Sequence, residues 1–79
     1  MDNMQKYKHA FMDSFSIDED KLNNDLLYNT IAAWDSVGHM SLIANLEDAF
    51  EIMLEMDDIV DFSSYERGLE ILTKYGVKF

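Results

Sequence analysis

The chain has no cysteine and no proline, and only six of its 79 residues are lysine or arginine. Without cysteine it has no disulfide framework, no thiolate nucleophile and no cysteine-ligated metal centre. Sixteen acidic residues against six basic ones give a formal net charge of -10. That charge repels nucleic acid and anionic lipid headgroups, so we expect protein partners that present basic patches.

Long apolar runs are also missing. No stretch approaches the roughly 18 apolar residues of a membrane span, and the first five residues lack the features of a secretory signal. We therefore expect a cytoplasmic protein with no stable membrane insertion. No phosphate-binding glycine loop, calcium-binding loop or catalytic histidine pair is found, so no metal site and no catalytic residue is predicted.

The apolar content is enough for a folded domain. Hydrophobic residues make up 48% of the chain and aromatic residues 13%, which is too much for a disordered acidic tail. Alternation of period two is absent, as are Asn-Gly hairpin turns. We expect one all-α domain that spans residues 1–79, near the lower size limit for a single apolar core.

Apolar residues at steps of three and four predict a first helix from about Asp2 to Ser14, with Asp2 as its N-cap. Residues 17–35 are rich in Asp and Asn, which favour turns, and we expect a long loop that Leu27, Trp34 and other apolar residues anchor. A second helix begins at Ser36.

Two shorter patterns complete the chain. Residues 55–61 predict a helix of one or two turns. Ser63 and Glu66 fit a capping box that starts a last helix, and Gly76 is expected to stop it. The predicted fold is a small four-helix bundle with a short third helix and a long loop between the first two helices.

The helix that begins at Ser36 has two apolar faces. The wider one is predicted to face the core and consists of Leu42, Ile43, Leu46, Ala49, Phe50 and Met53. The narrower stripe, flanked by acids, consists of Val37, Met40 and Ala44. This stripe is interpreted either as a docking surface or as ordinary variation of an exposed face.

Ser36 is the residue best placed for modification. Asp35 precedes it as the expected N-cap, and the helix dipole with its unpaired N–H groups favours a phosphate on the serine oxygen. An Asp-Ser pair also serves many helices as a cap only. The residue pattern alone leaves both readings open.

The segment from Trp34 to Met40 resembles the acyl carrier protein family, which has Asp-Ser-Leu or a close variant at the start of its second helix. Asp35, Ser36 and Val37 stand in that place here. The length, acidity and order of helices are similar over the whole chain.

The resemblance implies that Ser36 carries a 4'-phosphopantetheine arm, attached by a separate phosphopantetheinyl transferase with magnesium that Asp35 helps to hold. The chain itself would be a monomeric, non-catalytic carrier of acyl thioesters. Partners would be acyl-loading, condensing and acyl-transfer enzymes. The expected docking residues are Val37, Met40, Ala44, Glu47, Asp48, Glu51, Glu55, Asp57 and Asp58. The expected acyl-cavity residues are Leu42, Leu46, Ile59, Phe62 and Leu72.

The chain departs from the family after the serine, where Gly38, His39 and Ser41 stand in place of acids that contact basic partner enzymes. A carrier in a specialised acyl or polyketide pathway is thus as consistent with the residues as one in fatty acid synthesis. His39 is interpreted either as a group that tunes the modified site or as a structural residue.

Two alternatives stay open. A peptidyl, aminoacyl or D-alanyl carrier uses the same arm on the same kind of serine, and these residues do not identify the cargo. An unmodified helical adaptor would bind proteins through its acidic face and would not need the Ser36 hydroxyl.

Overall fold

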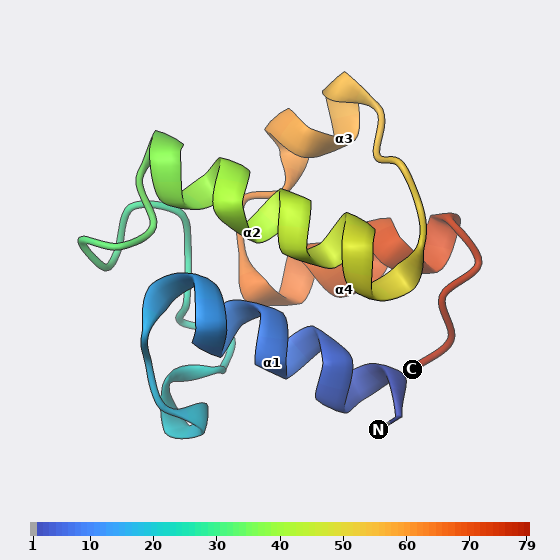
Figure 1. Cartoon of the computed structure of the whole chain (residues 1–79). Coiled ribbons are helices and arrows are strands. Elements are labelled where there is room, and N and C mark those ends of the chain that lie inside the picture. The colour runs from blue at the N-terminus through green and yellow to red at the C-terminus, as the bar shows by residue number, and fades with distance from the viewer. Residues whose placement is uncertain (1) are drawn as a thin grey trace.

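A computed structural model describes residues 2–79, and this part of the chain is helical without any strand (Figure 1). The helices are α1 (Asn3–Phe15), α2 (Ser36–Phe50), α3 (Met56–Asp61) and α4 (Tyr65–Lys74), with a short 3-10 turn η1 (Glu19–Lys21) between α1 and α2. The predicted all-α class is confirmed. None of the described helices is long and apolar enough to cross a membrane.

The starts of α1 and α2 follow from their capping residues. A carboxylate oxygen of Asp2 accepts a hydrogen bond from the Gln5 N–H at 2.8 Å, and Asp35 accepts from the Gly38 N–H at the same distance. Each bond satisfies one of the N–H groups that have no partner within the helix. Both predicted N-caps are confirmed.

The start of α4 was predicted one residue too early. The N-cap is Ser64, whose hydroxyl accepts from the Arg67 N–H at 2.8 Å, so the predicted Ser63–Glu66 capping box is wrong. The reason is tertiary, because the Ser63 carbonyl accepts a hydrogen bond from the Tyr28 N–H at 2.8 Å. This contact keeps the chain extended for one residue more.

Gly76 ends α4 as predicted. Its φ of 91° lies in the left-handed region that favours glycine. The Gly76 N–H donates to the Thr73 carbonyl at 3.1 Å, and the Val77 N–H donates to the Leu72 carbonyl at 3.2 Å. This pair of bonds is a Schellman motif, and it returns Val77 to the core.

Helices α1 and α2 run antiparallel side by side, α4 passes behind α2, and α3 lies on the side of α2 away from α1 (Figure 1). The two ends of the described chain meet, because the Asn3 side chain donates to the Lys78 carbonyl at 2.9 Å.

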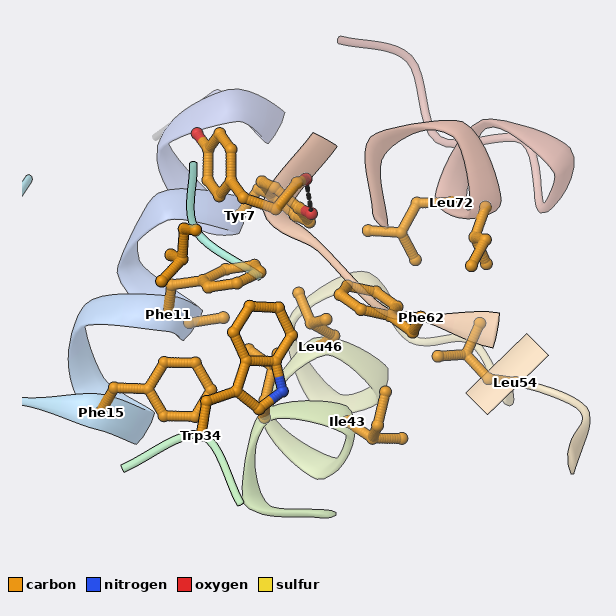
Figure 2. Packing of buried hydrophobic residues seen from close by; sticks show 14 of the residues in the cluster. Tyr7, Phe11, Phe15, Trp34, Ile43, Leu46, Leu54, Phe62 and Leu72 are labelled. Atoms are coloured by element: carbon orange, nitrogen blue, oxygen red, sulfur yellow. Dashed lines mark hydrogen bonds between the residues drawn. The ribbon is translucent and has the colours of Figure 1, made fainter. Parts of the chain in front are cut away.

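Aromatic side chains make up much of the core. Figure 2 shows Phe11, Phe15 and Trp34 packed in one group, and the Phe15 and Trp34 rings stack with centroids 5.3 Å apart. Trp34 is fully buried, so the end of the connection before α2 is anchored where the sequence predicted. The core residues are Tyr7, Ala10, Phe11, Phe15, Leu26, Trp34, Leu42, Ile43, Leu46, Leu54, Phe62, Tyr65, Ile71, Leu72 and Val77.

Two apolar residues expected inside lie outside. Met53 is 83% exposed, because α2 ends at Phe50 and Glu51 takes a left-handed conformation (φ 54°) that turns the chain out of helical phase. Leu27 is 45% exposed, whereas the neighbouring Leu26 is buried, so the core contact of this segment is made by Leu26.

Candidate functional site

Ser36 is the first residue of α2, and its side chain is exposed. Asp35 accepts two hydrogen bonds at the start of α2. Its carboxylate accepts from the Gly38 N–H, and its carbonyl accepts from the His39 N–H at 2.7 Å. The N–H groups of Ser36 and Val37 then remain at the positive end of the helix dipole. This end of α2 favours a negatively charged group on the serine oxygen.

The backbone before α2 lies unusually close to the helix. A Cβ added to Gly38 would come within 1.8 Å of the Ala33 carbonyl oxygen. Since no larger side chain fits without moving backbone, the tight entry accounts for the glycine at this position.

Ser36 also borders an apolar pocket of about 370 Å³ between α2 and α3. The walls come from both helices, from the segment before α4 and from the connection before α2. The lining residues are Tyr28, Ser36, His39, Met40, Met56, Ile59, Val60, Phe62 and Ser63. A group attached to Ser36 would therefore begin at the wall of a pocket large enough for part of it.

The structure divides the expected acyl-cavity residues into two sets. Ile59 and Phe62 line the pocket beside Ser36. Leu42, Leu46 and Leu72 do not, because all three are fully buried in the core.

Several lining residues were not singled out from the sequence. Met56 and Val60 are four apart on α3 and flank Ile59 in the lining, and this spacing was a usable signal for an apolar face. Tyr28 and Ser63 are joined by a backbone hydrogen bond between distant segments, and no local pattern indicates that contact.

His39 joins three segments at the inner side of the pocket. Its Nδ1 accepts a hydrogen bond from the Trp34 indole N–H at 2.9 Å, and its Nε2 lies 2.8 Å from the Ile59 carbonyl oxygen. Because an indole N–H only donates, we assign the proton to Nε2, which donates to the carbonyl. The imidazole thus ties α3 to α2 and to the residue before Asp35.

The narrow apolar stripe of α2 is exposed as expected. Val37 is 75% exposed and Met40 54%, and Ala44 is also exposed. Met56 and Val60 on α3 are 72% and 75% exposed, and they share the pocket with Met40. The exposed apolar surface thus extends from α2 onto α3.

The six expected docking acids fall into two groups. Four are exposed: Asp48, Glu51, Glu55 and Asp57. The other two are held by bonds within the fold. A Glu47 carboxylate oxygen accepts from the Leu54 N–H at 2.9 Å, and Asp58 accepts from Lys74 at 2.6 Å.

Asp58 connects α3 to α4 through two side chains. Its second carboxylate oxygen accepts from the Tyr75 hydroxyl at 2.5 Å. The hydrogen bonds from Lys74 and Tyr75 lower the pKa of the Asp58 carboxyl. The same carboxylate raises the pKa of Lys74 and of Tyr75.

The charged side chains that α2 and α3 themselves contribute are acidic, and Arg67 and Lys74 of α4 pair with Asp61 and Asp58 of α3. No lysine or arginine occurs between Lys21 and Arg67, so neither α2 nor α3 contains a basic residue. Within residues 2–79, no three histidine, aspartate or glutamate side chains gather closely enough to hold a metal ion.

The chain matches no protein-family model, no curated protein sequence and no solved structure.

Proposed function

We propose that this protein is an acyl carrier whose Ser36 bears a phosphopantetheine arm. The observation that carries the proposal is the double position of Ser36, which begins α2 behind the capping Asp35 and also borders the apolar pocket. The helix end suits the phosphate, and the pocket suits an apolar chain. The all-helical fold with acidic second and third helices agrees with the resemblance seen in the sequence.

The modification would be made by a separate transferase. The Ser36 oxygen forms a bond to the phosphorus of the phosphopantetheine unit, the pyrophosphate bond of coenzyme A breaks, and the hydroxyl proton is lost as adenosine bisphosphate leaves. Asp35 would help to hold the transferase's magnesium. The bound arm supplies a thiol for thioester formation, which the cysteine-free chain cannot offer.

Of the possible cargoes, the pocket favours an uncharged acyl group over an aminoacyl group. Its lining contains no lysine, arginine, aspartate or glutamate. An ammonium group placed there would lose its hydration without gaining a charged partner. We therefore place the carrier in fatty acid synthesis or in a specialised acyl or polyketide pathway of the cytoplasm.

Partner enzymes would dock on the exposed part of α2 and α3. Val37, Met40 and Ala44 supply apolar contact, while the exposed acids attract basic patches over a distance. Glu47 and Asp58 serve first to hold the fold together, so their contribution to docking would be smaller than that of Asp48 or Glu51.

Intact mass spectrometry tests the proposal. The unmodified protein is incubated with coenzyme A, magnesium and a broad-specificity phosphopantetheinyl transferase. We expect the mass of one phosphopantetheine to be gained by the wild type and by Ser63→Ala, but not by Ser36→Ala. Ser63 is the matched control because it is the other serine that borders this pocket. No gain by folded wild-type protein would favour the adaptor reading.

The docking surface is tested by the rate of this transfer at rising salt. Electrostatic attraction raises the encounter rate and is screened over about 8–10 Å at physiological salt. We expect kcat/KM of the transferase to fall with salt, and to fall less steeply for a variant with Asp48→Asn and Glu51→Gln. Equal salt dependence of both proteins would contradict recruitment by these acids.

A further inference from the structure

Two of the rings that line the pocket, those of His39 and Phe62 (the inner rings), pack against the fully buried core residues Trp34 and Phe11. The imidazole and the phenyl ring meet edge to face with centroids 6.1 Å apart. Leu42, Leu46 and Leu72 are fully buried and do not border the pocket. On the side of the core, the accessible space thus ends at the lining to which these two rings belong.

Neither ring can move inward without breaking other contacts. His39 is fixed by hydrogen bonds to the Trp34 indole and the Ile59 carbonyl. Phe62 lies directly on the backbone of α4, since a Cβ added to Gly68 would come within 2.2 Å of its ring tip. Protein interiors are close-packed, so an added chain cannot displace such a ring without cost.

Other lining residues of the pocket are open to solvent. Met56 and Val60 on α3 are 72% and 75% exposed, and Met40 on α2 is 54% exposed. A chain that starts at Ser36 can therefore cover these side chains, but its far end must return to water once the inner rings are reached.

We propose that His39 and Phe62 set the cargo length of this carrier, and that the pocket holds a short, uncharged acyl chain and leaves the end of a longer one in water. The inference rests on the proposed carrier function. His39 acts as a positioning residue, because it holds α3 through the Ile59 carbonyl.

The depth of the pocket can be measured without the arm. The chain has no cysteine, so Ser36→Cys introduces a single thiol at the pocket wall. Alkyl methanethiosulfonates from methyl to dodecyl each form a disulfide with this thiol and release methanesulfinate. The Tm of each adduct is then compared with that of the methyl adduct of the same variant.

We expect the Tm to rise by several degrees through the shorter alkyl chains and then to stay level, since methylenes beyond the inner rings remain in water. Adding Phe62→Leu or His39→Ala should extend the rise to longer chains. Adding His39→Gln should keep the original limit, because a glutamine amide can still donate to the Ile59 carbonyl.

Three results would overturn the inference: a Tm that rises steadily to the dodecyl adduct, a Tm that no alkyl chain raises, or the same limit with Phe62→Leu and His39→Ala as without them. Comparison with each variant's own methyl adduct removes general losses of stability. The alkylation needs neither coenzyme A nor a transferase. A failure of arm attachment would thus count against the proposed function, but it would not change the result of the alkylation experiment.

Discussion

Gly68→Ala is predicted to destabilise the protein, although the same change stabilises most helices. Gly68 is buried in the middle of α4, where alanine has the better helix propensity by about 1 kcal/mol. The added methyl group would lie 2.1 Å from the Tyr7 hydroxyl oxygen and 2.2 Å from the tip of the Phe62 ring. Both distances are far below contact distance, so one or both side chains must move.

The cost of this movement exceeds the gain in propensity. Overpacking of a core costs about 1–3 kcal/mol. Displacing the Tyr7 hydroxyl also weakens its hydrogen bond to the Tyr65 carbonyl, which contributes about 1 kcal/mol. The net loss is about 1–3 kcal/mol, which corresponds to a fall in Tm of roughly 6–18 °C for a domain of this size.

Thermal unfolding followed by circular dichroism measures the change. A double-mutant cycle with Phe62→Leu provides the control, because the smaller side chain should recover part of the loss caused by Gly68→Ala. An unchanged or higher Tm for Gly68→Ala would refute the reasoning. It would also remove the support that α4 gives to Phe62 in the lining of the pocket.

Two further predictions concern α3 and α4. The pKa of Asp58 is lowered in the fold. Its carboxylate therefore stabilises the protein at pH values well above the ordinary carboxyl pKa of 3.8, and this contribution is lost as the pH falls through the lowered pKa. Urea unfolding at several pH values measures this contribution. As the pH falls, the free energy of unfolding should decrease less for Asp58→Asn than for the wild type, and an equal decrease in both proteins would contradict the role of Lys74 and Tyr75. Ser64→Ala should cost about 1 kcal/mol through loss of the N-cap, whereas Ser63→Ala should be nearly neutral; similar losses would contradict the assigned cap.

Local chemistry explains which parts of the fold could be predicted. Asp2, Asp35 and Gly76 act on backbone groups within a few residues of themselves, and all three were predicted in their roles. The start of α4 depends on the contact between Ser63 and Tyr28, which lie 35 residues apart in sequence, and was missed. Met53 was missed because nothing in the helical period indicates that α2 stops at Phe50.

The candidate site was predictable at its outer edge and less so inside. Ser36 and the exposed stripe lie on one helix, so periodicity was sufficient to place them. The bond from Trp34 to His39 and the bond from His39 to Ile59 join the helix to segments before and after it. Such contacts depend on tertiary packing, as does the full burial of Leu42 and Leu46 in the core, away from the pocket lining to which the sequence assigned them.

The central claim is tested most directly on protein isolated from its native cells at native levels. Trypsin would leave Ser36 in one long peptide, because no lysine or arginine lies between Lys21 and Arg67. Chymotrypsin, which cleaves after aromatic residues such as Trp34, gives a shorter peptide for tandem mass spectrometry. We predict phosphopantetheine on Ser36, with part of the population bearing a neutral acyl thioester. An unmodified Ser36 throughout the native protein would contradict the account.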